Sequence, residues 1–256
     1  MPNYVKNELL IVGDDKDLNA LAELVKSEHT VFSFDRIVPM PKTMYIPCSS
    51  LTDTAYDAVC GNPEAMERLK KRFGNAKSAS ADQSYLFDER FPGSNTPKTL
   101  EDALFLGKVV QENLQKYGKK NWYDWSIENW GTKWNAGEAS MTRGNMSSGE
   151  HSGKTALVYR FDTAWSAPLP ILLALQRKFP VLLFVLAWAD EDTGYNCGRV
   201  QTFVGKTDSW DIYEPEEGSE EAIKFAEAVW DDTFWNESNI AMISKSSEKE
   251  SAENVQ

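Results

Sequence analysis

One stretch of the sequence decides the fold class: residues 155–204, which read TALVYRFDTAWSAPLPILLALQRKFPVLLFVLAWADEDTGYNCGRVQTFV. Residues 155–162 and 181–188 are apolar runs typical of buried strands, and residues 168–179 carry apolar side chains at helical spacing. An acidic turn then leads to a further strand at residues 195–204. The order strand, helix, strand, strand predicts an α+β protein with helices on one face of an antiparallel sheet.

The N-terminal part of the chain predicts a strand and a helix that join this sheet. Val5 and residues 9–12 form an apolar strand pattern that ends at a Gly-Asp-Asp turn, and residues 16–28 follow with amphipathic helical spacing. Residues 31–34 predict a short strand, and residues 37–41 an extended segment, because proline disfavours helix in the residue before it. Residues 1–40 could share a sheet with residues 133–204 or form a separate lobe, and we expect the single sheet.

Residues 48–118 have a different character and predict a helical insertion in the sheet. Helical spacing occurs in three segments, 51–59, 63–73 and 99–117, and glycines follow the second and third where helices commonly end. The polar residues 75–97 between them predict a mobile loop.

The formal net charge of −12 is distributed very unevenly along the chain. Residues 206–256 contain 14 acidic residues and 4 lysines, a net charge of −10, whereas residues 1–205 carry a net charge of only −2. We therefore expect an α+β body at residues 1–206, followed at residues 207–256 by an acidic helix and a disordered tail that begins near Ser244. A nucleic-acid backbone would be repelled by this segment, so direct nucleic-acid binding is not expected.

Several other classes of protein are disfavoured by the sequence. The longest apolar region, residues 171–189, is interrupted by charged residues and proline, and the N-terminus has no secretory pattern, which predicts a cytoplasmic protein without a membrane span. Cys48, Cys60 and Cys197 are widely spaced, and the chain has only 2 histidines, so neither disulfides nor a metal or other cofactor is predicted. The oligomeric state stays open.

Two short motifs have simpler explanations than catalysis. Residues 149–155, GEHSGKT, resemble a phosphate-binding loop, but one residue is missing between the glycines and a strand rather than a helix follows. The acidic residues 190–192 could bind Mg²⁺ or Ca²⁺, but they fit a solvated hairpin turn better because no second carboxylate cluster accompanies them. We assign no catalytic residues.

The most unusual segment, residues 122–136, reads WYDWSIENWGTKWNA and contains four tryptophans. Tryptophan clusters occur in cores and at recognition surfaces, because each indole has a large apolar area and an N–H that needs a partner. The rings could simply pack this segment against the sheet. Alternatively, they could form a stacking platform for a small ligand, whose pocket would be lined by Trp130, Lys133, Trp134, Asn135, Asp162 and Trp165.

Five segments of the chain also carry a family resemblance: MPN at 1–3, FSFDRIVPMP at 32–41, WYDW at 122–125, NWGTKWNA at 129–136 and FDTAWSAP at 161–168. Together they resemble the YubB-type, ferredoxin-like family of uncharacterised proteins found on plasmids, phages and genomic islands. The resemblance spans most of residues 1–206 and implies a ferredoxin-like sheet and a mobile-element origin. It implies no reaction and no catalytic residues.

Two hypotheses of function follow. The first is an accessory protein of a mobile element that binds a host or defence protein through its acidic segment, although a merely solvated helix and tail would explain the same charge. The residues expected to contact this partner are Glu214, Glu216, Glu217, Glu220, Glu221, Asp231 and Asp232. The second hypothesis is a small-ligand or nucleotide-binding protein, possibly an enzyme, that uses the tryptophan-rich pocket. Burial of the indoles would favour the first hypothesis, and an open cleft beside Lys133 the second.

Overall fold

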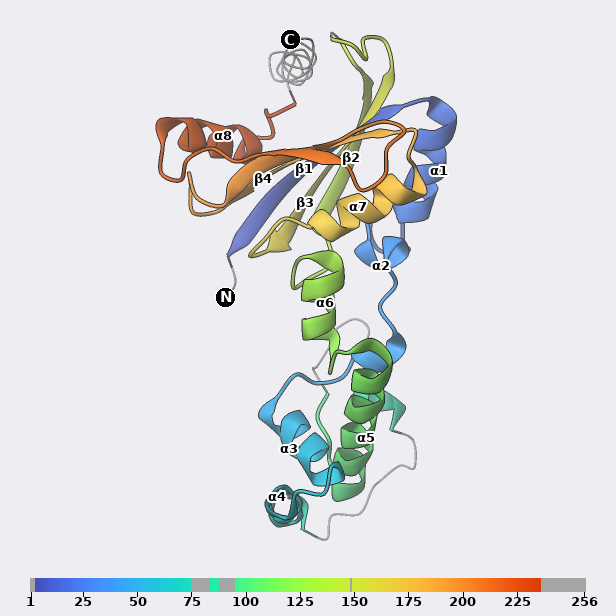
Figure 1. The fold of residues 1–256 in the computed structure, drawn as a ribbon, viewed down its shortest axis with the longest axis vertical. Helices are drawn as coiled ribbons and strands as arrows, with labels where there is room; N and C mark the ends of the chain where they lie inside the picture. Colours follow the sequence, from blue (N-terminus) through green and yellow to red (C-terminus); the bar gives the residue numbers. More distant parts are fainter. Residues whose placement is uncertain (1–2, 75–82, 88–94, 148, 236–256) are drawn as a thin grey trace, which may run out of the picture. The chain divides into compact units, whose positions relative to one another are not determined.

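The computed structural model describes residues 3–74, 83–87, 95–147 and 149–235. The chain divides into two compact units (Figure 1). We call Met1–Pro39 together with Asn129–Gln256 the sheet unit, and Met40–Glu128 the helical unit. The expected disordered tail from Ser244, and residues 75–82 and 88–94 of the expected loop, lie outside the described residues.

The sheet unit contains six strands and four helices among its described residues. The strands are β1 (Tyr4–Gly13), β2 (Gly137–Asn145), β3 (Thr155–Ala164), β4 (Leu183–Asp190), β5 (Cys197–Thr202) and β6 (Trp210–Tyr213). The helices are α1 (Asp15–Val25), α2 (Phe34–Ile37), α7 (Leu169–Lys178) and α8 (Glu220–Trp230).

All strands pair antiparallel in the order β2-β3-β1-β4-β5-β6, which confirms the α+β class. The first strand lies in the middle, where Leu10 faces Val158 on β3 and Ile11 faces Phe184 on β4. The N-terminal strand and the second half of the chain therefore share one sheet, as expected.

Side chains alternate along β1 between two separate cores. On one face, α1 and α7 contact the sheet, and the ring of Phe32 lies 4.8 Å from Tyr159 and 4.9 Å from Phe161 between centroids. On the other face, Leu10 and Val12 belong to the cluster formed with α8.

The helices lie on both faces of the sheet rather than on one, which corrects this detail of the expected fold (Figure 1). The physical reason is that every residue of β4 is buried, so each face of this central strand needs a cover. Ala222, Ala226 and Val229 form the apolar stripe of α8 that covers the second face.

The expected strand at residues 31–34 is wrong. Phe32 and Phe34 are both fully buried, and α2 begins at Phe34. The backbone N–H of Ser33 donates to the carbonyl of Val25 (2.8 Å), and that of Phe34 donates to Oδ1 of Asn135 (2.7 Å). These bonds replace the ladder that a neighbouring strand would supply.

The described elements of the helical unit are η1 (Lys42–Met44), α3 (Ser50–Val59), α4 (Pro63–Phe73), η2 (Ser84–Leu86) and α5 (Leu100–Tyr117), while α6 (Trp122–Trp130) crosses its boundary. Helix α5 packs on α3 so closely at Gly107 that an added Cβ would lie 2.3 Å from the carbonyl oxygen of Ala55. Thr99 and Asp102 form a capping box at the start of α5. No helix in the described part of the chain is long and apolar enough to cross a membrane.

Candidate functional site

Two residues of the expected ligand pocket serve to fasten the tryptophan-rich segment to the sheet unit. Trp130 is only 4% exposed, and its Nε1–H donates to the carbonyl of Val38 (2.9 Å). Besides accepting from Phe34, Asn135 donates through Nδ2 to Oγ of Ser33 (3.2 Å). The polar groups of both side chains therefore form hydrogen bonds with the segment around α2.

Three other members of the expected pocket do come together. The Nζ of Lys133 lies 4.8 Å from the ring centroid of Trp165 and 5.6 Å from that of Trp134. The ring of Tyr4 lies 6.1 Å from that of Trp134. We call these four residues the aromatic patch. Trp165 is 40% exposed, so the patch offers an aromatic and cationic surface rather than a closed pocket.

The backbone of Trp165 has a left-handed conformation, with φ = 71°. This conformation is unfavourable for a bulky residue and persists only when its surroundings enforce it. Its N–H donates to the carbonyl of Asn3 (3.0 Å), and its own carbonyl accepts from Nδ2 of Asn196 (2.9 Å). These two bonds hold the exposed indole in place.

Asp162, the sixth expected member, belongs to a different cluster. It pairs in register with Lys6, so its side chain alternates to the face of the sheet that α8 covers. Burial raises the pKa of Asp162, Lys6 lowers it, and the carboxylates of Glu138 and Asp232 raise it further.

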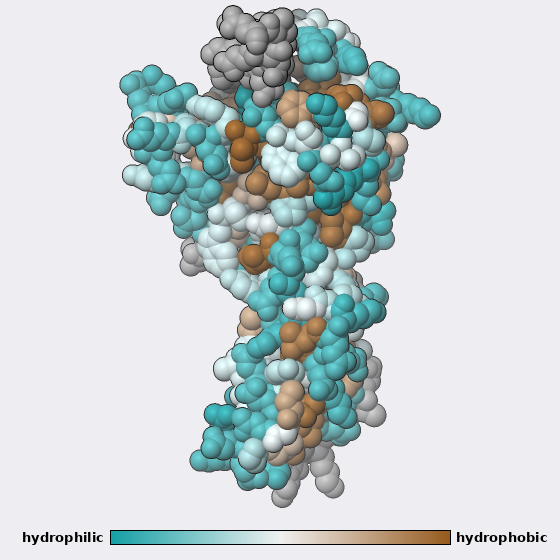
Figure 2. Space-filling view, in the orientation of Figure 1, coloured by the Kyte–Doolittle hydropathy of each residue, from teal (hydrophilic) through white to brown (hydrophobic). Residues whose placement is uncertain are grey.

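Most of the expected partner-binding carboxylates are exposed near α8. This holds for Glu214, Glu216, Glu217, Glu220, Glu221 and Asp231. Glu220 accepts a bond from Nζ of Lys224 (2.6 Å), and Glu221 accepts one from the hydroxyl of Tyr213. Figure 2 shows hydrophilic side chains gathered where α8 lies. We call the five glutamates the acidic surface.

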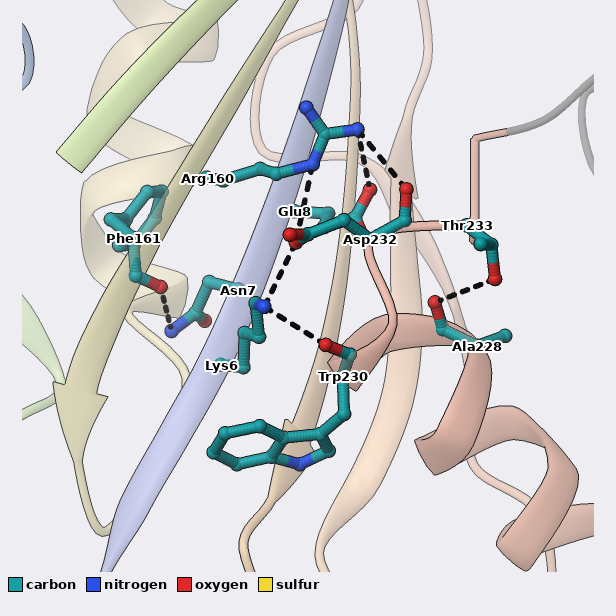
Figure 3. Close-up of polar contacts among 9 residues, drawn as sticks. All are labelled: Lys6, Asn7, Glu8, Arg160, Phe161, Ala228, Trp230, Asp232 and Thr233. Atoms are coloured by element: carbon teal, nitrogen blue, oxygen red, sulfur yellow. Dashed lines mark hydrogen bonds and ion pairs between the residues drawn. The ribbon is translucent and has the colours of Figure 1, made fainter. Parts of the chain in front are cut away.

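Asp232 is half-exposed like its neighbours but differs from the other acids because it forms ion pairs with two cations of the sheet (Figure 3). Its Oδ1 lies 2.9 Å from Nζ of Lys6 and 3.4 Å from Nε of Arg160. Lys6 also donates to the carbonyl of Trp230 (3.0 Å). These contacts fasten the end of α8 to β1 and β3.

A buried carboxyl group lies beneath this ion-pair cluster. The side chain of Glu8 is fully buried, and neither of its oxygens has a hydrogen-bond partner among the described residues. Its Oε2 lies 3.6 Å from Nη2 of Arg160, too far for a good hydrogen bond (Figure 3). Burial raises the pKa of Glu8 to about 7, although Arg160 and Lys6 pull it down. The group therefore changes charge near neutral pH.

This cluster was not predicted from the sequence, although the strand periodicity contains a signal for it. Lys6 and Glu8 are two residues apart in a strand, so they share one face, and Arg160 and Asp162 do the same on the neighbouring strand. The apolar run that follows them in β1 predicts only a buried strand and does not indicate a polar cluster. Among the described residues, no group of three or more His, Cys, Asp or Glu could hold a metal ion.

The second half of the sheet unit matches a known family. The family model described as a ferredoxin-like domain in Api92-like protein matches residues 129–233. This part of the chain, from the end of α6 to just beyond α8, is therefore similar to that domain, in agreement with the expected ferredoxin-like fold.

Comparison with whole proteins gives little more. No curated protein matches the chain. Among solved structures, the crystal structure of a protein api92 from Yersinia pseudotuberculosis is 10% identical, covers 84% of this chain and 99% of its own, and has a TM-score of 0.39.

Proposed function

We propose that this protein is a non-enzymatic accessory protein of a mobile genetic element, which acts in the cytoplasm by binding a protein partner through the acidic surface. The mobile-element origin is supported by the YubB-type resemblance of five sequence segments. The binding role is supported by one observation above all. Five glutamates are exposed within residues 214–221, where α8 begins: Glu214, Glu216, Glu217, Glu220 and Glu221.

Few cations accompany this surface along the chain. Only one lysine, Lys224, occurs between residues 207 and 235, and it pairs with Glu220. Such an exposed pair contributes little stability, so we attribute the concentration of acids to recognition rather than to folding. An acidic surface fits a partner with a basic face, as nucleic-acid-binding proteins have, and it speeds the encounter by electrostatic steering.

Capture from a nuclease-treated bacterial lysate at low salt tests this proposal. The wild type is compared with a variant in which the five glutamates of the acidic surface become glutamine. A matched control changes five other exposed glutamates, two of them in the helical first turns of α4 and α5: Glu28, Glu64, Glu67, Glu101 and Glu112. Both variants lose five negative charges, so an effect of net charge alone would appear in both.

The wild type and the control should capture the same protein, and the acidic-surface variant should lose it. Added duplex DNA or 0.5 M salt should release the protein, because both compete with or screen the charged contact. Equal capture by all three proteins, or no capture at low salt, would show that the acidic surface does not bind a partner.

A second candidate function is binding of a small ligand or nucleotide at the aromatic patch. The exposure of Trp165 and its left-handed backbone favour it, because conformational strain concentrates at ligand-binding positions. The burial of Trp130 counts against the larger pocket expected from the sequence, and for this reason we place this function second.

Titration with a panel of nucleotides, followed by tryptophan fluorescence, tests the second function. Trp165→Ala should abolish any quenching, and Trp210→Ala should keep it, because Trp210 is similarly exposed (45%) but lies on β6. A flat response of the wild type across the panel would remove this candidate.

A further inference from the structure

A groove of about 840 Å³ opens on the α8 side of the sheet. Its walls include Phe225 and Ala228 of α8, Phe234 beyond that helix, Tyr213 of β6 and Arg199 of β5. The groove falls within the usual size range of small-molecule sites. Its aromatic lining is continuous, because the ring of Phe225 lies 4.8 Å from that of Phe234 and 6.3 Å from that of Tyr213.

Arg199 is the unusual member of this lining. It pairs in register with Ala187 on one side and with Tyr213 on the other, so it projects from the middle of a largely apolar face. Its guanidinium carbon lies 6.0 Å from the ring centroid of Tyr213. Within the described part of the chain, its guanidinium group makes no hydrogen bond and no ion pair within 4.0 Å.

The environment of Arg199 is costly for a cation. Burial lowers the pKa of Arg199, and the nearby Asp211 and Tyr213 offset this only in part. A partly desolvated guanidinium group without a hydrogen-bonded anion is unfavourable, and its planar set of five N–H donors fits a carboxylate with two parallel hydrogen bonds.

We propose that the groove binds a monocarboxylic acid with an aromatic or aliphatic body, whose carboxylate pairs with Arg199 and whose body packs on Phe225 and Phe234. Glu220 and Glu221 also line the groove, but neither pairs with Arg199, because Glu220 pairs with Lys224 and Glu221 accepts from Tyr213. Their negative charges favour a ligand with a single charge, because they repel a dianionic phosphate more strongly than a carboxylate. This site does not depend on the function of the acidic surface.

Two probes of nearly the same shape test the site: 1-naphthylacetate, which is an anion, and its neutral amide, 1-naphthylacetamide. Both have an aromatic body, and only the first has a carboxylate. Isothermal titration of the full chain should show that the wild type binds the carboxylate more tightly than the amide, on the order of tenfold, the typical effect of a charge-assisted pair of hydrogen bonds.

Arg199→Met keeps the apolar stem of the side chain and should remove this preference, so that both probes bind equally. Ala228→Phe should fill the groove and weaken both probes. Arg177→Met is the matched control, because Arg177 lies on α7 and pairs through Nε with Asp208 (2.7 Å); it should bind both probes like the wild type. Far-ultraviolet circular dichroism verifies that each variant is folded.

Three results would overturn the proposal: no binding of 1-naphthylacetate by the wild type, equal affinity of the wild type for both probes, or an unchanged preference in the folded Arg199→Met variant. Because neither probe resembles a protein partner, a negative result here leaves the capture experiment unaffected, and the reverse is also true.

Discussion

Replacement of Glu8 by glutamine should make the protein more stable at neutral and alkaline pH. The pKa of Glu8 rises from its ordinary value of 4.5 to about 7 because the side chain is buried. Below pH 4.5 the carboxyl group is neutral in both the folded and the unfolded chain. Above pH 7 it is charged in both, and the folded chain carries the cost of a buried charge.

The size of the effect follows from the difference between the two pKa values of Glu8, 4.5 in the unfolded chain and about 7 in the folded one. One pH unit corresponds to about 1.4 kcal/mol, so ionisation of Glu8 lowers the free energy of unfolding by about 3 kcal/mol. The wild type has these 3 kcal/mol of stability, roughly, below pH 4.5, where Glu8 is neutral, and loses them as the pH rises through 7. The Glu8→Gln variant has no ionisable group at this position and should not lose this stability.

Urea unfolding of both proteins at pH 5, 6, 7 and 8, followed by tryptophan fluorescence, measures this effect. The informative quantity is the difference between the variant and the wild type, because the other titratable groups of the chain are present in both. The difference should grow by about 2–3 kcal/mol between pH 5 and 8, because part of the total loss already occurs below pH 5. Glu23→Gln, at an exposed glutamate, should show no such trend. A difference that does not change with pH, or that shrinks as the pH rises, would refute the reasoning.

Three further substitutions test the packing and capping described above. Gly107→Ala should lower the free energy of unfolding of the helical unit by about 1–3 kcal/mol, because the new Cβ would collide with the backbone of Ala55; hydrogen exchange of the α5 amides measures the loss. Thr99→Ala should cost about 1 kcal/mol through loss of the N-cap and should speed exchange only near the start of α5. Trp130→Phe should cost about 1–3 kcal/mol in thermal unfolding, because the carbonyl of Val38 loses its donor; an unchanged melting temperature would show that this bond contributes nothing.

The elements that sequence reasoning found share a strong local signal. Strand β4 was predicted within two residues at each end because it is apolar throughout, and α5 within one residue because its cap and terminal glycine mark its ends. Strand β2 was missed because its sequence, GEASMTRGN, is polar and largely exposed on both faces, so no alternation marks it. Strand β6 is only 4 residues long and was missed as well.

The candidate sites were harder to predict because they depend on contacts between distant residues. The composition of the tryptophan-rich segment suggested a pocket, but the role of Trp130 depends on a carbonyl 92 residues away. Asp232 was expected at the partner surface, and its bond to Lys6 spans most of the chain. The partners of such groups follow from the order of strands in the sheet, which the periodicity of a single segment does not reveal.

The bond between Trp130 and Val38 also bears on the evolution of this protein. Val38 is one of the last residues before the chain leaves the sheet unit, and Trp130 is one of the first after its return. Exit and re-entry are thus joined by an indole–carbonyl bridge that belongs entirely to the sheet unit. Because this bond holds the two ends of the helical unit together, that unit can be lengthened, shortened or exchanged between relatives without distorting the sheet unit.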